Sequence, residues 1–251
     1  MTLSGDGVLM DASKTSRDRP TQPIGNLRIL PGVVAGALRN SFTDPQDLRH
    51  GLIRNVWVEL KRFAAQNVRT VELTRIRGIH RVNVEGPVVR HGSLVVSALA
   101  TLLECERIFD FGTSDGETSH LLAHNLPGAE IYSFEGSSGA GHSGAGSIRA
   151  APASGIARLY GDSASFDFSP YSGSIDLVHI DGASRAASLE ADADAAFGML
   201  SELGSIIWYG YSYQPAVYAF LNKLAPALDR PVYHLLGTRL ALYSRWDIVV
   251  S

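Results

Sequence analysis

The stretch Ile108–Ser119 constrains the fold of this chain more than any other. It opens with the strand-like run Ile108–Phe111, in which Asp110 is the only polar residue, passes through a loop with Gly112 and Gly116, and then becomes helical in character. A strand that runs through a glycine turn into a helix leaves free backbone N–H groups at the helix N-terminus, where the helix dipole adds positive potential. The sequence therefore predicts a nucleoside-like ligand at this turn.

Strand-like and helical segments alternate from about Gly92 onward. Strands are expected at Arg107–Phe111, Glu130–Glu135, Ile156–Tyr160, Ile175–Ile180 and Gly204–Tyr209, and helices at Leu94–Leu103, Thr118–Asn125, Ser184–Leu200 and from Pro215. This alternation is typical of a mostly parallel, doubly wound α/β sheet with helices on both faces. The segments Val232–Leu236 and Arg239–Tyr243 predict a hairpin that adds an antiparallel edge.

Three regions follow from the change in composition along the chain. Residues 1–30 are polar and are expected to form a flexible arm. Residues 31–91 are expected to form an extension that acts as a lid or a dimer contact, with a helix over Pro45–Gln66 and one or two short strands within Val68–Val84. Residues 92–251 form the ligand-binding domain, in which the Gly/Ser-rich stretch 136–155 should be a flexible connection or a poor helix.

The composition excludes several classes of protein. The 251 residues carry a formal net charge of −3, which gives no support for nucleic acid or an anionic membrane surface as a partner. The longest apolar stretch, Leu94–Leu103, is about half the ~20 residues that span a bilayer, and the start of the chain has no signal-peptide pattern. We therefore expect a cytoplasmic, soluble protein. Its single cysteine, Cys105, lies between two glutamates and is expected to be an inert core residue.

Acidic residues stand at the ends of four expected strands. They are Asp110, Glu135, Asp162 (followed by Ser163) and Asp181. Ligands of an open parallel sheet bind at the carboxyl ends of its strands, so these acids are candidates for the hydroxyl and amino groups of an adenosine. No lysine follows the glycine loop, which excludes a Walker P-loop, and glycines four residues apart weaken the alternative of an NAD-dependent oxidoreductase.

The residues from about Gly92 to Arg245 resemble the class I S-adenosylmethionine-dependent methyltransferases, in particular the small-molecule O-methyltransferase and macrocin-methyltransferase-like branch. The segments that match are Phe109–Gly116, Ile131–Glu135, Gly161–Ser163, Val178–Gly182 and Leu203–Trp208. The resemblance implies a Rossmann-like sheet of seven strands, the last one antiparallel, and S-adenosyl-L-methionine as the cofactor, with S-adenosyl-L-homocysteine as the product. It also implies a small-molecule acceptor, and we expect a homo-oligomer.

The same resemblance assigns the candidate cofactor-binding residues. Those of the glycine motif would line the methionine and ribose, Glu135 would bind the ribose hydroxyls, and Asp162 with Ser163 would lie near the adenine. The full set is Asp110, Gly112, Thr113, Ser114, Gly116, Glu135, Gly136, Asp162, Ser163 and Asp181.

Methyl transfer to a hydroxyl also needs a base, for which His179, Asp181 and Tyr209 are the main candidates. His179 and Asp181 are two residues apart on one strand, so they face the same way and could act as a base and its orienting acid. A core role for His179 remains the alternative. His142 on the Gly-rich stretch and Tyr211 are further candidates, each with an ordinary surface or packing role as the alternative.

The sequence departs from metal-dependent relatives, which carry a second acid or a histidine after the fourth-strand motif. Here Asp181 is followed by Gly-Ala-Ser-Arg, so we expect no catalytic metal. His120 and His124 have a spacing that can bind metal, but a surface pair is the simpler interpretation. The hypothesis is a metal-independent O-methyltransferase; the alternative is a descendant that does not methylate, either catalysing another reaction on the same scaffold or serving as a binding subunit.

Overall fold

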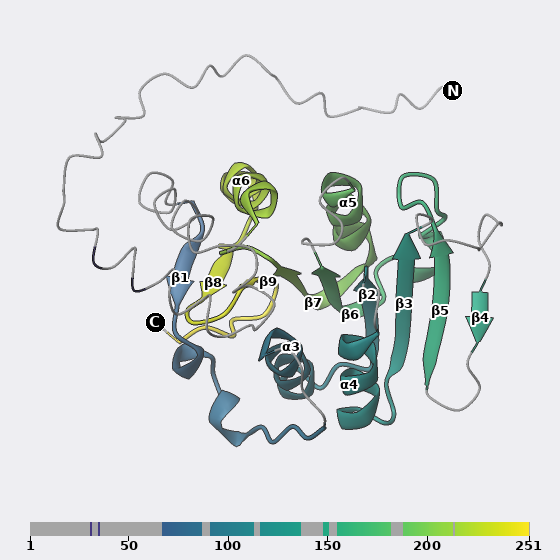
Figure 1. The fold of residues 1–251 in the computed structure, drawn as a ribbon, viewed down its shortest axis with the longest axis horizontal. Helices are drawn as coiled ribbons and strands as arrows, with labels where there is room; N and C mark the ends of the chain where they lie inside the picture. Colours follow the sequence, from purple (N-terminus) through teal and green to yellow (C-terminus); the bar gives the residue numbers. More distant parts are fainter. Residues whose placement is uncertain are drawn as a thin grey trace, which may run out of the picture.

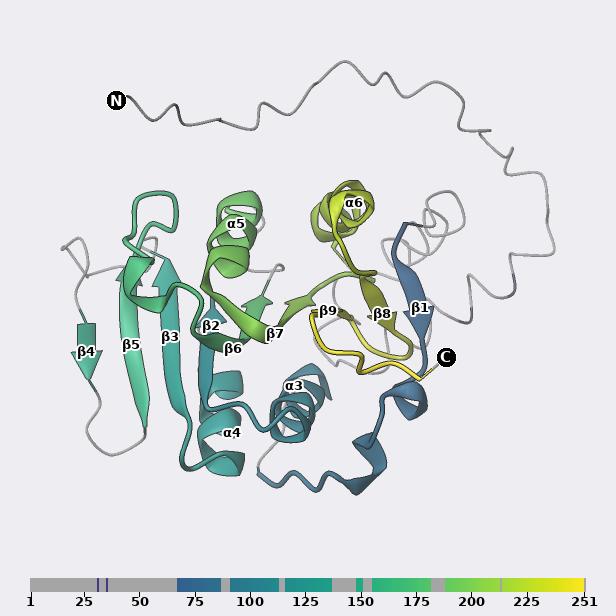
Figure 2. The same ribbon diagram turned by 180° about the vertical axis from the view of Figure 1, so that it is seen from behind.

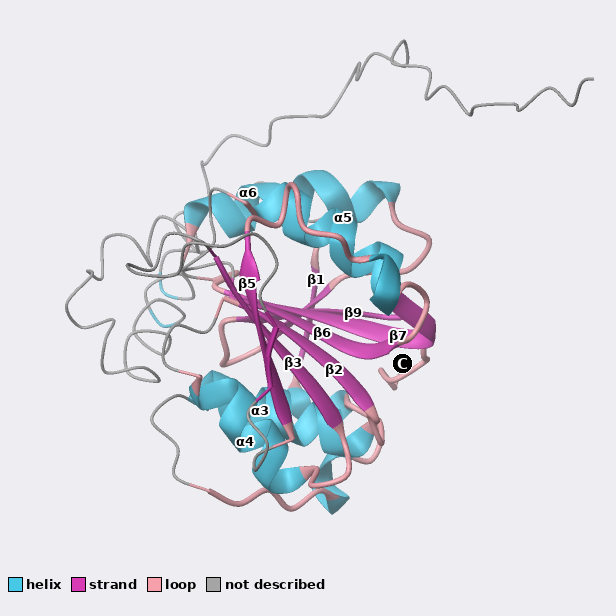
Figure 3. Ribbon diagram, turned by 90° about the vertical axis from the view of Figure 1, so that its right-hand side faces the viewer, coloured by secondary structure: helices cyan, strands magenta, loops and turns pink. Residues whose placement is uncertain are grey.

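The computed structural model describes the chain at residues 67–86, 91–112, 116–136, 148–150, 155–181, 188–212 and 214–250, and at Pro31 and Ala35. These residues form three layers, in which one twisted sheet separates two pairs of helices (Figures 1 and 3). One face carries α3 (His91–Leu102) and α4 (Glu117–Asn125), and the other carries α5 (Leu189–Met199) and α6 (Pro215–Leu224). The arm expected over 1–30 and the helix expected over 45–66 fall outside the described residues, Pro31 and Ala35 being the described positions nearest to them.

The sheet contains the seven strands that the sequence predicts. In spatial order they are β8 (Tyr233–Leu235), β9 (Leu240–Ser244), β7 (Leu200–Tyr209), β6 (Ile175–Asp181), β2 (Arg107–Phe111), β3 (Glu130–Gly136) and β5 (Ile156–Gly161). Neighbours pair in parallel, except that β9 is antiparallel to both β7 and β8. The prediction of a mostly parallel Rossmann-like sheet with an antiparallel C-terminal hairpin is therefore confirmed.

Within the described ranges, two further strands extend the sheet to nine (Figure 2). β1 (Arg69–Val71) pairs in parallel with β8 at one edge, and β4 (Ile148–Ala150) pairs antiparallel with β5 at the other. β4 lies within the stretch for which we expected a flexible connection or a poor helix. The C-terminal hairpin joins the sheet beyond β7, as expected, and β9 lies between β7 and β8 and is buried along all five of its residues.

Two apolar clusters fill the spaces between the layers. Phe109 and Phe111 of β2 belong to the cluster under α5 and α6, whereas Ile108 belongs to the cluster under α3 and α4. Side chains alternate between the faces of a strand, so Asp110 must share the α3 and α4 face with Ile108. α6 begins at Pro215, as expected. Proline suits this position because the N–H group of a first helical residue has no partner within the helix, so its absence costs nothing. In the described part of the chain, no helix is long and apolar enough to cross a membrane.

Candidate functional site

Side chains from four adjacent strands meet at the carboxyl edge of the sheet, on the face that α3 and α4 cover. The register places Asp110 of β2 beside His179 of β6, and Asp181 of β6 beside Tyr209 of β7. Glu135, next to the last residue of β3, lies one strand further along, because β3 pairs with β2. The sequence predicted this convergence from the positions of the strand ends, and the topology brings the four strands together.

Asp110 is the centre of a buried polar group. Its side chain has no exposed surface, and His179 Nδ1 donates a hydrogen bond to one carboxylate oxygen at 2.8 Å. The hydroxyl of Ser119, in the first turns of α4, donates to the other oxygen. A buried carboxylate is costly unless such bonds satisfy it, so the three residues hold one another in place. Because Nδ1 faces a carboxylate, Nε2 is the ring nitrogen that carries the lone pair in the neutral form of the ring.

The acid that contacts His179 is therefore Asp110, where the sequence had suggested Asp181 as its orienting partner. The physical reason is distance. Residues two apart along a strand are separated by about 6.6 Å, whereas directly opposed residues on paired strands approach to about 5 Å. Asp181 is itself 6% exposed, at the end of β6.

The two glycines that flank the turn, Gly112 and Gly116, have backbone angles that favour glycine. Gly112 has φ of 87° and Gly116 has φ of 69°, both in the left-handed region that favours glycine. The Gly112 N–H is bonded to the carbonyl of Phe134 at 2.9 Å, and α4 begins directly after Gly116. Thr113 and Ser114, the other candidates of this turn, lie outside the described residues.

Glu135 has a cationic neighbour that the sequence analysis missed. Arg158 of β5 lies opposite Ser133 of β3, and its Nη1 is 3.6 Å from a carboxylate oxygen of Glu135. Its Nη2 lies near Gly116, 3.7 Å from where a Cβ on that residue would be. The period of two along β5 was the available signal, because it places Arg158 on the same face as Glu135. Gly136 closes β3 beside Gly161 of β5.

Asp162 and Ser163 follow β5 in a tight turn. A carboxylate oxygen of Asp162 accepts a hydrogen bond from the Ala164 N–H at 3.1 Å, and Ser163 is buried. Asp162 and Ala164 also line a groove of about 630 Å³, the rest of which is formed by the start of α5 and by α6. The predicted role of this turn near an adenine stays a prediction.

Tyr209 also has a cationic neighbour that the sequence analysis missed, Arg239. The Arg239 guanidinium donates from Nη1 to the Tyr209 hydroxyl at 3.2 Å, although Arg239 is only 4% exposed. The ring of Tyr209 packs on the first turn of α3, where a Cβ on Gly92 would lie 3.0 Å from it. Tyr211, in contrast, is a core residue that packs against Tyr218. A lone arginine within the apolar hairpin was the signal for Arg239.

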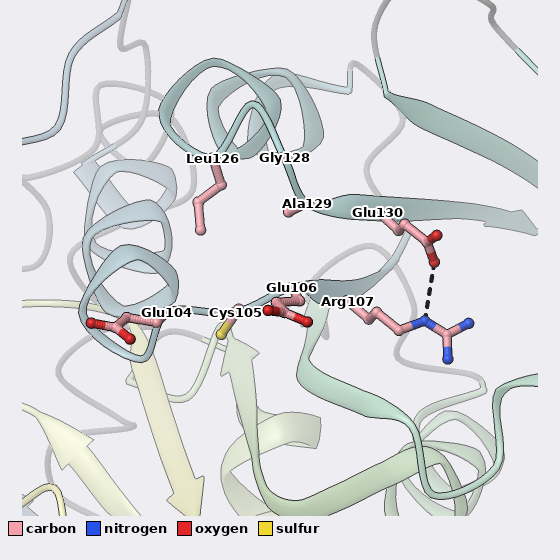
Figure 4. Close-up of a pocket in the computed structure, with 8 residues that line it drawn as sticks. All are labelled: Glu104, Cys105, Glu106, Arg107, Leu126, Gly128, Ala129 and Glu130. Carbon is pink, nitrogen blue, oxygen red and sulfur yellow. Dashed lines mark hydrogen bonds and ion pairs between the residues drawn. The ribbon is translucent and has the colours of Figure 1, made fainter.

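A groove of about 860 Å³ lies at the opposite, amino edge of β2 and β3 (Figure 4). Arg107 and Glu130 form an ion pair there at 3.1 Å, and Cys105 lies on its wall. The groove is remote from Asp110 and Glu135. It borders the amino ends of β2 and β3, whereas these two acids lie toward the carboxyl ends of the same strands.

Cys105 should be unreactive in the folded protein. Burial raises the pKa of its thiol, and the nearby Asp176 carboxylate raises that pKa further. Because a raised pKa depletes the thiolate at every pH below it, we expect iodoacetamide to leave the native protein unmodified at mildly alkaline pH and to modify one thiol per chain in urea. Mass spectrometry measures the difference; rapid labelling of the native protein would contradict it.

Metal-binding groups do not cluster in the described part of the chain, where no set of three His, Cys, Asp or Glu side chains lies close enough to hold an ion. His120 and His124 are both exposed on α4. Residues 182–187, which follow Asp181, lie outside the described part, and so does His142.

Comparison with known proteins shows only weak similarity. No family model and no curated protein matches the chain. Among solved structures, it is similar to the O-methyltransferase TomG from Streptomyces achromogenes, with 17% identity, a TM-score of 0.44, and coverage of 73% of this chain and 92% of that one. It is also similar to an O-methyltransferase from Bacillus cereus, with 15% identity, a TM-score of 0.45, and coverage of 66% and 83%. Because these sequence identities and TM-scores are low, a proposal for the function has to rest on the residues of the site.

Proposed function

We propose that this chain is an S-adenosylmethionine-dependent methyltransferase that transfers a methyl group to an oxygen of a small molecule without a metal. The observation that carries the proposal is the convergence of Asp110, Glu135, His179, Asp181 and Tyr209 at one edge and on one face, beside the Gly112 turn. In an open α/β sheet this is the place where ligands bind.

The residues at this edge fit the chemistry of an adenosyl cofactor. The turn between Gly112 and Gly116 leads into the N-terminus of α4, where a helix presents backbone N–H groups, and it lacks the lysine of a Walker P-loop. Glu135 is proposed to accept hydrogen bonds from two ribose hydroxyls, and Arg158 beside it limits the directions that its carboxylate can take. Gly136, Asp162, Ser163, Thr113, Ser114 and Asp181 complete the proposed cofactor set.

His179 is proposed as the general base. When bound, the cofactor supplies a methyl group already activated by a sulfonium. The acceptor hydroxyl gives its proton to Nε2 of His179, while Asp110 keeps the ring oriented through Nδ1 and stabilises the charge that forms. Both carboxylate oxygens of Asp110 are already bonded, to His179 and Ser119, so we assign it to positioning His179 rather than to direct contact with the cofactor. Tyr209, held by Arg239, would border the acceptor.

Two measurements test the function. Isothermal titration should show S-adenosylmethionine and S-adenosylhomocysteine binding at one site per chain, and a panel of phenols and catechols should include an acceptor that yields S-adenosylhomocysteine. Activity that survives EDTA supports the metal-independent mechanism. Absence of cofactor binding would overturn the proposal, and binding without transfer to any acceptor would favour the non-methylating alternative.

Replacing Glu135 with alanine should weaken cofactor binding by about 1–3 kcal/mol, because charge-assisted hydrogen bonds to the ribose are lost. Glu130 provides the matched control: it lies at the other end of β3 and pairs with Arg107. Titration of Glu130→Ala should give the wild-type affinity. Equal affinities for both variants would remove Glu135 from the site.

The proposal extends to a homo-oligomer in the cytoplasm with a role in secondary metabolism. Light scattering coupled to size-exclusion chromatography measures the oligomeric state directly.

A further inference from the structure

We propose that the groove between the C-terminal end of α3, the segment 76–83 and the segment 246–248 binds an aromatic acid. The groove has a volume of about 460 Å³, within the range of roughly 300–1,000 Å³ that small-molecule sites occupy. Its lining includes Arg77, Arg81, Leu102, Leu103, Glu104 and Trp246. This site is independent of the proposed methyl transfer.

The walls of the groove are held together by the backbone. Ile76 forms a β-bridge with Val249, and the Arg77 N–H is bonded to the carbonyl of Ile248 at 2.8 Å. Gly78 packs on α3, where a Cβ would lie 3.2 Å from Leu102. The cavity is therefore formed before a ligand arrives, which reduces the ordering that binding would require.

The apolar lining suits a planar ring. Leu102, Leu103 and Ile248 supply aliphatic surface, and Trp246 lines the same groove although 48% of its surface is exposed. Trp208, in contrast, is completely buried in the core. A half-exposed indole beside aliphatic surface is the usual composition of an aromatic binding site, because stacked or edge-on rings add to the energy of burial.

The charges of the groove call for an anion. Arg77 and Arg81 are both exposed, and within the described residues neither has a carboxylate in ion-pair range. Glu104 is the one acid in the lining, so two guanidinium groups outnumber it. Guanidinium forks bind carboxylates in a bidentate manner, and arginine also stacks on aromatic rings. A ring that carries a carboxylate satisfies both features.

The groove is separate from the candidate active site. Gly92, near the start of α3, contacts Tyr209, whereas the groove borders Leu102 at the end of the same helix. Ten residues of helix span about 15 Å. A ligand of the groove should therefore bind without displacing the cofactor.

The test uses 1-naphthoate as the probe and the neutral 1-naphthalenemethanol as its uncharged analogue, titrated into the full chain by calorimetry. We expect 1-naphthoate to bind at least about tenfold more tightly than the alcohol, the size of one charge-assisted contact. The Arg77→Gln/Arg81→Gln double variant should abolish this preference, and Trp246→Ala should weaken both ligands. Matched controls are Arg69→Gln, an exposed arginine on β1, and Leu203→Ala, an exposed apolar residue outside the groove.

Several results would overturn the proposal. One is equal binding of the acid and the alcohol, or no binding of either. Another is an unchanged preference in the double arginine variant while circular dichroism shows it folded. Competition between 1-naphthoate and S-adenosylhomocysteine would place the probe in the other cleft. If S-adenosylhomocysteine fails to bind at all while 1-naphthoate behaves as expected, the proposed methyl transfer falls and the groove stands.

Discussion

Valine in place of Gly112 will remove measurable binding of S-adenosylmethionine, with a loss of affinity of about 100-fold or more. Gly112 has φ of 87°, which costs a residue with a Cβ roughly 1–2 kcal/mol, and more for a β-branched one. The branched side chain would also stand where the proposed cofactor approaches the backbone at the strand end. Isothermal titration measures the affinity, and thermal unfolding separates it from loss of the fold.

Gly128 supplies the control for this substitution. A Cβ there would meet no atom within 4 Å, and its backbone is not left-handed. Gly128→Ala should bind the cofactor as the wild type does. Should the valine variant of Gly112 fail to fold, Gly112→Ala provides the milder form of the same strain. Wild-type affinity in a folded Gly112 variant would exclude the turn from the cofactor site.

Changing Asp110 to asparagine should lower the rate constant of methyl transfer by about 100-fold or more while the affinity for the cofactor stays the same. Asparagine keeps the shape and can still accept from Ser119, but it no longer imposes a proton on Nδ1 of His179 or stabilises a charged ring. Loss of the orienting acid in serine-protease triads has effects of this kind. Nitrogen NMR of the His179 ring should show a changed tautomer.

Asp194→Asn, at an exposed position of α5, is the matched control and should leave both the rate and the ring unchanged. A different result for Asp110→Asn would reassign the residue. If cofactor affinity falls together with the rate, Asp110 belongs to the cofactor site, as the family resemblance first implied. If neither changes, His179 is a core residue that the reaction does not use.

Much of the sheet could be predicted because its signals are local. Apolar runs followed by glycine or an acid marked the strand ends, and the alternation with helices fixed their parallel direction. Those two facts alone bring Asp110, Glu135 and Asp181 to a common edge. The short edge strand β1 lies where one or two short strands were expected, but β4 was misread, because three residues are too few to display a period.

The contacts within the site could not be predicted, because they depend on register between strands far apart in the chain. His179 and Asp110 are 69 residues apart, and only the pairing of β2 with β6 sets them side by side. Arg158 and Arg239 reach the site from β5 and from the turn before β9. The sequence indicates only which strand or turn carries each of these arginines; which carboxylate or hydroxyl each one reaches follows from the topology.

The position of β9 has a consequence for biosynthesis. This strand comes late in chain order, yet it fills the gap between β7 and β8, and its five residues are buried. While the chain emerges from the ribosome, β8, which pairs with β1 on its other side, therefore has no bonded neighbour toward β7 until residue 244 has left the exit tunnel. The nascent sheet would expose two unpaired edges during that interval, which is when chaperones would recognise it.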